Sequence, residues 1–191
     1  MTSSKLAFIA ACASVIASAV FAADSPYAGQ QSRAIKALSA DEISDYLEGR
    51  GMGTSKAAEL NHYPGPVHVL AESARLGLSD TQRAQTQAIF DAMSVEAKRS
   101  GRAIVGKEAE LEALYTQGKA TNEQVKRVLD ELARLQAEFR YSHLSAHLAL
   151  RSVLTAEQVA QYDSMRGYTD DGGKSSSPAS SGSGGHEHRH H

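Results

Sequence analysis

The sequence holds little cysteine, tryptophan or proline. Cys12 is the only cysteine, tryptophan is absent, and only four prolines occur in 191 residues. Because Cys12 lies in a segment that we expect to be removed, the remaining chain offers no disulfide and no thiolate ligand. The fold must then be stabilised by its apolar core alone, and any metal site must use His, Asp, Glu or Met side chains.

A strong charge of either sign is also missing. The 20 basic and 22 acidic residues give a formal net charge of −2, which becomes −3 once Lys5 is removed with the first 22 residues. Because no basic patch is evident, we do not expect a nucleic acid partner. No acidic pair is set apart for general acid–base catalysis, and no serine lies in a nucleophile elbow. We therefore expect neither enzymatic activity nor a small-molecule substrate.

The first 22 residues have the pattern of a signal peptide. Lys5 is followed by an apolar run over residues 6–22, and Val20-Phe21-Ala22 places small residues at the two positions that signal peptidase reads. We predict export to the periplasm with cleavage after Ala22. Two alternatives stay open. One is an uncleaved membrane anchor, although a comfortable span needs about 20 apolar residues. The other is lipidation at Cys12.

The chain after the signal peptide is rich in Ala, Leu, Glu, Gln and Arg, which favour helix. We predict an all-α protein. Residues 23–77 should form short helices and connectors, and residues 78–167 a long antiparallel helical hairpin with a short last helix. Residues 168–191 form a tail that begins rich in Ser, Gly and Asp, a composition that cannot build a core.

Helix starts are marked by a recurring pattern, a Ser or Thr with Glu or Gln three positions later. The hydroxyl can accept from the backbone N–H of the third helical residue, and that residue's side chain can reach back to the cap. Such capping boxes predict four helix starts, and the six expected helices cover residues 40–48, 54–60, 66–76, 79–115, 121–153 and 155–166. The pairs are Ser39 with Glu42, Ser79 with Gln82, Thr121 with Gln124, and Thr155 with Gln158.

The helix expected over residues 121–153 carries two apolar faces. One is a heptad seam, and the other is a smaller group on the far side, formed by Tyr141, Leu144 and Leu148. A helix with two apolar faces needs two partners. One is the other arm of the hairpin, and the second is either the front helices or a second subunit. The seam comprises Val125, Val128, Leu132, Leu135, Phe139, Ser142, Ala146, Ala149 and Val153.

His143 and His147 are four residues apart, so a helix places both side chains on one face, about 6 Å apart. Two such imidazoles can bind one transition metal ion, for example Zn²⁺, Ni²⁺ or Cu²⁺, when another segment adds ligands. His62, His68, a carboxylate or a symmetry mate could do so. The alternative is that both are boundary residues bonded to neighbouring carboxylates. We expect His62 and His68 themselves to be structural.

The last six residues contain four histidines. Uncharged imidazoles are available as ligands near neutral pH, and a His-rich tract can collect zinc, nickel or copper. Because Glu187 and Arg189 interrupt the run, we interpret it as a native tail rather than a cloning tag. The four are His186, His188, His190 and His191.

Two of the capping boxes both follow a leucine and end in glutamine, Leu78-Ser79-Asp80-Thr81-Gln82 and Leu154-Thr155-Ala156-Glu157-Gln158. In an exported, helical chain without cysteine, this pair of Leu-Thr/Ser-x-x-Gln motifs resembles the Spy/CpxP family of periplasmic proteins. That family includes the zinc-resistance-associated proteins and the periplasmic heavy-metal sensor and resistance proteins. The resemblance covers residues 78–166.

The resemblance implies a cradle-shaped dimer of helical hairpins. It also implies ATP-independent protection of unfolded envelope proteins, or metal sensing, or both. His143-x-x-x-His147 is similar to the spaced histidine pairs of the metal sensors. The chain departs from those sensors because it lacks a second such pair near the front, where His62 and His68 are six apart. It departs from the chaperones because it is mildly acidic, whereas their client surface is basic.

Two functions are therefore expected as alternatives. The first is a metal-binding stress or resistance protein that uses His143, His147 and the tail, and signals to a membrane-bound sensor or anti-sigma protein. The second is a metal-independent holdase whose client surface lies around Leu144 and Leu148, or an adaptor that represses an envelope-stress sensor.

Overall fold

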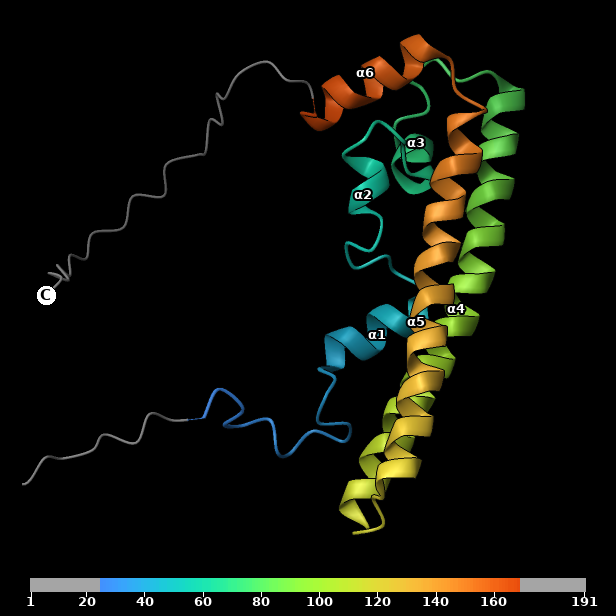
Figure 1. Ribbon diagram of the computed structural model, residues 1–191. Helices are drawn as coiled ribbons and strands as arrows, with labels where there is room; N and C mark the ends of the chain where they lie inside the picture. Colours follow the sequence, from blue (N-terminus) through green and yellow to red (C-terminus); the bar gives the residue numbers. More distant parts are fainter. Residues whose placement is uncertain (1–24, 169–191) are drawn as a thin grey trace, which may run out of the picture.

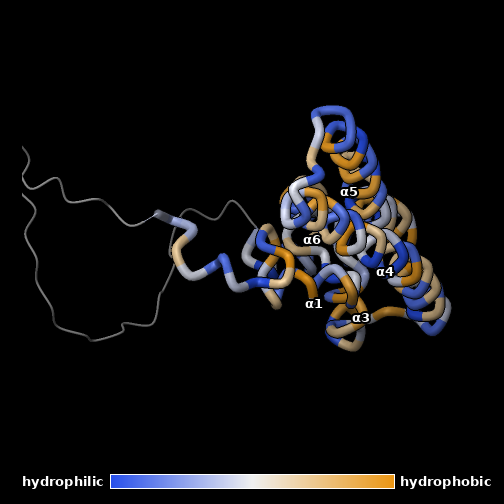
Figure 2. Tube along the Cα trace, turned by 90° about the horizontal axis from the view of Figure 1, so that it is seen from below, coloured by the Kyte–Doolittle hydropathy of each residue, from blue (hydrophilic) through white to orange (hydrophobic). Residues whose placement is uncertain are grey.

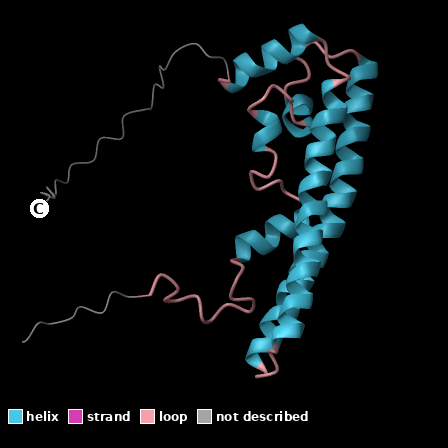
Figure 3. Cartoon of the chain, in the orientation of Figure 1, coloured by secondary structure: helices cyan, strands magenta, loops and turns pink. Residues whose placement is uncertain are grey.

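The computed structural model describes residues 25–168 and contains six α-helices and no strand within that range (Figures 1 and 3). The all-α fold and the long helical hairpin expected from the sequence are confirmed. The helices are α1 (Ala40–Glu48), α2 (Lys56–Glu59), α3 (Pro66–Ala71), α4 (Asp80–Thr116), α5 (Asn122–Arg151) and α6 (Ala156–Arg166).

The helices α4 and α5 run antiparallel, and the other four pack on this pair (Figure 1). At 37 residues, α4 is about 55 Å long, from a rise of 1.5 Å per residue. The connection between α4 and α5 contains Gly118, whose φ of +64° suits a residue without Cβ. Hydrophobic and hydrophilic residues alternate along both helices, as expected for helices with one buried face (Figure 2). Their shared core contains Ala97, Ile104, Val128, Leu132, Leu135 and Phe139.

The seam predicted on α5 is correct in its first half and shifts in its second. Phe139 and Ala146 are buried as expected, but Ala149 is exposed and Leu150 is fully buried in its place. An α-helix has 3.6 residues per turn, so a repeat of 3.5 drifts by about 20° per heptad. The same drift carries His143 and His147 into the buried face. The prediction that Ala149 belongs to the seam was therefore wrong.

Three of the four capping boxes form in full, at Ser39, Ser79 and Thr155. Thr121 accepts from the backbone N–H of Gln124, but the return bond is not made. The two leucine-containing motifs also join each other. The Gln82 amide donates to Gln158 Oε1 (2.8 Å), and the Gln158 amide donates to Gln82 Oε1 (3.1 Å). The start of α4 is thereby tied to the start of α6.

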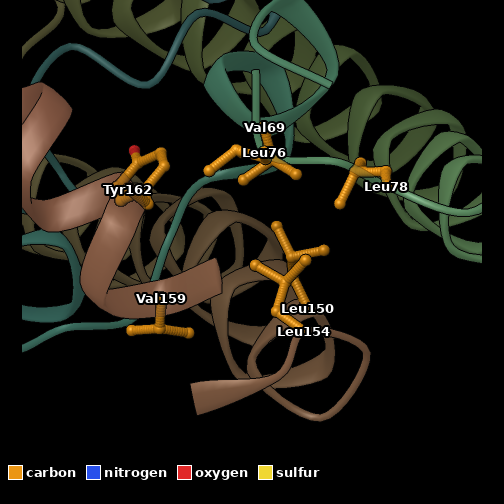
Figure 4. Close-up of a cluster of buried hydrophobic side chains, with 7 residues drawn as sticks. All are labelled: Val69, Leu76, Leu78, Leu150, Leu154, Val159 and Tyr162. Atoms are coloured by element: carbon orange, nitrogen blue, oxygen red, sulfur yellow. The ribbon is translucent and has the colours of Figure 1, made fainter. Parts of the chain in front are cut away.

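A second core lies where α3, α6 and the ends of the hairpin meet (Figure 4). Both motif leucines, Leu78 and Leu154, are buried in it. Burial of each such side chain stabilises the fold by about 1.5–3 kcal/mol, so this cluster fixes α6 across the end of the hairpin (Figure 1). Its members are Val69, Leu76, Leu78, Leu150, Leu154, Val159 and Tyr162.

The helix α1 crosses α4 at unusually short range. A Cβ on Gly101 would lie 1.9 Å from the backbone oxygen of Tyr46, so only glycine permits this approach. The Tyr46 ring then packs edge-on against Phe139 of α5, with 5.3 Å between ring centroids. Through this contact α1 is seated on both arms of the hairpin.

The front helices are shorter than the sequence predicted. The helix expected over residues 54–60 is reduced to α2, and the one expected to run on toward Gly77 stops at Ala71. Gly77 still takes the left-handed conformation expected of a cap (φ +62°). Turns hold the chain between Ala71 and Gly77, and in one of them the Leu76 N–H donates to the backbone oxygen of Glu72 (2.9 Å).

Several expectations concern segments outside the described residues. They are the signal peptide with its cleavage after Ala22, lipidation at Cys12, and the tail histidines. Within residues 25–168, no helix is long and apolar enough to cross a membrane. The dimeric cradle stays a prediction.

Candidate functional site

His143 and His147 lie one turn apart on α5 and face the front helices. Both are almost fully buried, with 4% and 6% of their surfaces exposed. They line a pocket of about 560 Å³ together with Glu59 and His68. The expectation that a helix brings the two imidazoles to one face is met. Both therefore lie deeper in the fold than the boundary positions of the alternative.

His147 is held by the loop that precedes α3. Its Nδ1 lies 2.7 Å from the backbone oxygen of Tyr63. A carbonyl oxygen can only accept, so Nδ1 carries the hydrogen and Nε2 of the neutral ring keeps its lone pair. Gly65 packs against the same ring, where a Cβ would lie 3.0 Å from Cε1 and 3.3 Å from Nε2. A histidine oriented by a second bond in this way has the arrangement of a metal ligand.

His143 is packed between aromatic and backbone groups. Its ring meets Phe139 edge-on at 5.0 Å, and Gly51 passes close to its Nδ1. Its Nε2 is buried and has no hydrogen-bond partner among the described residues. Burial lowers the pKa of His143, and the neighbouring His147 lowers it further. The ring is therefore kept neutral, which is the form that binds a metal ion.

Glu59 of α2 is the carboxylate closest to this pair. Its Oε2 lies 3.7 Å from His147 Nδ1. Its Oε1 accepts from the hydroxyl of Tyr162 (2.5 Å) and from that of Tyr168 (3.3 Å), and lies 3.5 Å from Arg166 Nε. Burial and the bond to Glu59 raise the pKa of Tyr162, so that phenol remains a donor. Glu59 thus stands between the histidines and α6.

The two front histidines take different places. His62 pairs with Asp163 of α6, with 2.8 Å between Nδ1 and Oδ2, which agrees with its expected structural role. His68 lines the same pocket as the histidine pair. Partial burial lowers the pKa of His68, and the positive charge of Arg166 adds to the effect.

The histidine pair resembles part of a metal site, but the set of ligands is incomplete. No group of three His, Cys, Asp or Glu side chains within residues 25–168 is placed to hold a metal ion as it stands. The donors are nevertheless suitable, since imidazole with a carboxylate suits zinc, nickel and copper. Within residues 25–168, the Nε2 nitrogen of His143 has no hydrogen-bond partner and could act as a metal ligand.

The expected client surface is exposed. Tyr141 and Leu148 show 69% and 59% of their surfaces to solvent, and Leu144 is half-buried. Tyr141 also borders an apolar groove of about 460 Å³ between α4 and α5. The far side of α5 therefore has no partner in the described chain.

Glu59 was not singled out from the sequence. It is one of 22 acidic residues and belongs to a four-residue helix, and no motif marks it. The only signal is its position, shortly before the Tyr63-Pro64-Gly65-Pro66 loop that packs on His147. The tail histidines His186, His188, His190 and His191 lie outside the described residues.

Comparison with known families identifies the chain. The sequence model of the heavy-metal resistance family matches residues 51–161, more than half of the 191 residues. The matched range contains Glu59, His68, His143 and His147. No curated protein and no solved structure matches the chain. The match confirms the resemblance to the Spy/CpxP-like zinc-resistance proteins. This chain belongs to the heavy-metal resistance family.

Proposed function

We propose that the protein is an exported, periplasmic metal-binding stress or resistance protein, in which His143 and His147 bind a divalent ion of the zinc, nickel and copper group. The observation that supports this most directly is the pair of buried imidazoles one turn apart on α5, opening into one pocket. Membership of the heavy-metal resistance family supports it independently.

Each side chain has a distinct part in the proposed site. His147 offers Nε2, because its Nδ1 hydrogen is bonded to Tyr63. His143 offers Nε2, which has no other partner in residues 25–168. Glu59 or His68 completes the set after a small movement. The tail histidines form a second, weaker place of capture, because no fixed geometry selects among metals there.

The proposal also includes a cellular location, an assembly and a partner. A signal peptide cleaved after Ala22 would deliver it to the periplasm, with retention by an uncleaved anchor as the alternative. A homodimer is the expected assembly, and a membrane-bound sensor or anti-sigma protein is the expected partner. No enzymatic activity is proposed.

Calorimetric titration with Zn²⁺, Ni²⁺ and Cu²⁺ tests the site. The first protein is the full chain with the four tail histidines changed to serine, and the second adds His143→Leu and His147→Gln. We expect saturable binding near one metal per chain or per dimer in the first protein and its loss in the second. Circular dichroism checks that both are folded. An unchanged isotherm after the two helical substitutions would show that the helical site is wrong.

A second function, metal-independent protection of unfolded envelope proteins, is favoured by the exposure of Leu148 and of Tyr141, which borders an apolar groove. We expect the double variant Tyr141→Ser and Leu148→Ser to lose suppression of client aggregation while it keeps metal binding. Exposed Leu129, changed to Ser, is the matched control. If the wild-type protein does not slow aggregation of a reduced, unfolding client, this second function is excluded.

A further inference from the structure

We propose that metal binding at the histidine pair loosens the C-terminal half of α6, with Glu59 as the link. This inference rests on the proposed function and adds its regulation. Glu59 belongs to α2, yet its carboxylate is shared between two neighbours. One oxygen faces His147 (3.7 Å), and the other is contacted by two side chains of α6 and by Tyr168, which follows it.

The contacts of Glu59 with α6 and the residue after it are extensive. Tyr162 and Tyr168 donate to Oε1 through their hydroxyls, and Arg166 adds a positive charge at 3.5 Å. Only 14% of the Glu59 side chain is exposed. A carboxylate that is this far from water gives charge-assisted bonds, which are about twice as strong as neutral ones. Glu59 is therefore one attachment of this end of α6, beside the buried Tyr162 ring and the pair of His62 with Asp163.

The same carboxylate is the nearest one available to a metal ion at the histidines. Three metal-binding side chains do not yet converge among the described residues, so a ligand must move before a metal is fully bound. When Glu59 turns toward His143 and His147, its Oε1 leaves the donors on α6. A divalent cation would also repel the guanidinium of Arg166. In this proposal Glu59, rather than His68, is the ligand that moves, so metal binding and this attachment of α6 compete for one carboxylate.

The other end of α6 has a separate attachment, which limits the change to its C-terminal half. Gln158 is paired with Gln82, and Val159 is buried in the second core. Neither contact involves Glu59. The loosening therefore affects the stretch from Tyr162 to Arg166, while the buried Tyr162 ring and the pair of His62 with Asp163 keep that stretch in place.

Hydrogen exchange of the α6 amides tests the loosening. The protein is the full chain with serine at the four tail histidine positions, measured with and without saturating Zn²⁺. Loss of a bond to a charged group is expected to speed exchange over residues 160–168 by about tenfold. Glu59→Gln keeps an oxygen for Tyr162 but is a poor ligand, and it should abolish the response. Unchanged or slower exchange with Zn²⁺ bound would overturn the inference and leave the metal site standing.

The coupling must also be visible from the other direction, because linkage is reciprocal. Tyr162→Phe removes the shortest bond to Glu59 and should raise the affinity for Zn²⁺ by about tenfold. Tyr115→Phe, at an exposed tyrosine of α4, is the matched control and should change nothing. Equal affinities of Tyr162→Phe and wild type would refute the link. If the wild type does not bind Zn²⁺ at the histidine pair, the proposed function and this inference both fail.

Discussion

The two glycines inside α4 should respond to alanine in opposite directions. In an exposed helix position, Gly→Ala stabilises by about 0.5–1 kcal/mol, because alanine loses less backbone freedom on folding. Gly106 is exposed, and a Cβ there would meet no atom within 4 Å. We therefore expect Gly106→Ala to raise the melting temperature by about 2–4 °C. Helix propensity alone predicts the same gain at Gly101.

The packing of α1 reverses the sign at Gly101. The new Cβ would lie 1.9 Å from the Tyr46 oxygen and 2.7 Å from its carbonyl carbon, and both are backbone atoms that cannot swing aside. Overpacking of a fitted interface costs about 1–3 kcal/mol, and more where backbone must shift. With the propensity gain subtracted, Gly101→Ala should destabilise by about 2 kcal/mol, which lowers the melting temperature by about 4–8 °C.

Urea unfolding followed by circular dichroism measures both variants on one scale. Hydrogen exchange then distinguishes local from global effects, since displacement of α1 should expose the amides of Ala40–Glu48 before the hairpin opens. If Gly101→Ala stabilises the protein as much as Gly106→Ala does, α1 does not cross α4 at the distance described here, and the reasoning is refuted.

Three further predictions concern the motif pair, the buried histidine and the pocket wall. Gln82→Ala and Gln158→Ala should each lower the free energy of unfolding by about 1 kcal/mol. A double-mutant cycle measured by urea unfolding should give a coupling energy of about 0.5–1 kcal/mol between the two side chains. Additive effects would refute the hydrogen-bonded amide pair. The free energy of unfolding of the metal-free protein should fall as pH drops below about 6.5, because unfolded His143 then takes up a proton that the folded ring, with its lowered pKa, resists. His143→Leu should flatten this dependence of the unfolding free energy on pH. If the dependence is equally steep in the variant, it arises from groups other than His143. Gly65→Ala should weaken Zn²⁺ binding by about tenfold or more in calorimetry, because the new Cβ would lie 3.0 Å from the His147 ring. Unchanged affinity would mean that Nε2 of His147 is not a ligand.

The elements that the sequence predicted well are those fixed by local chemistry. Ser79 and Thr155 form their capping boxes because the hydroxyl, the backbone N–H and the glutamine are all within one turn. Elements that depend on distant partners were predicted less well. Whether Ala149 or Leu150 is buried depends on the drift of α5 against α4, and the ends of the short front helices depend on what they pack against.

The candidate site shows the same division. The spacing of His143 and His147 was enough to place both imidazoles on one face. The spacing did not give their depth of burial or the bond from His147 to Tyr63, because both depend on the connectors before α2 and α3 that pack on α5. Glu59 could not be found at all, since its importance comes from α6, which lies about 100 positions later in the chain.

The repeated motif and the metal site are connected through α6. The Gln82–Gln158 pair holds the start of α6 on the start of α4, and the buried leucines of the motifs hold it over the hairpin end. This position brings Tyr162 to Glu59, and Glu59 to the side of His147. If the histidine pair binds a metal ion as proposed, a chain without the second motif would lack a fixed α6, and Glu59 would reach the metal ion with less restraint. On that proposal the motif does more than begin two helices, because it raises the metal concentration at which the site fills.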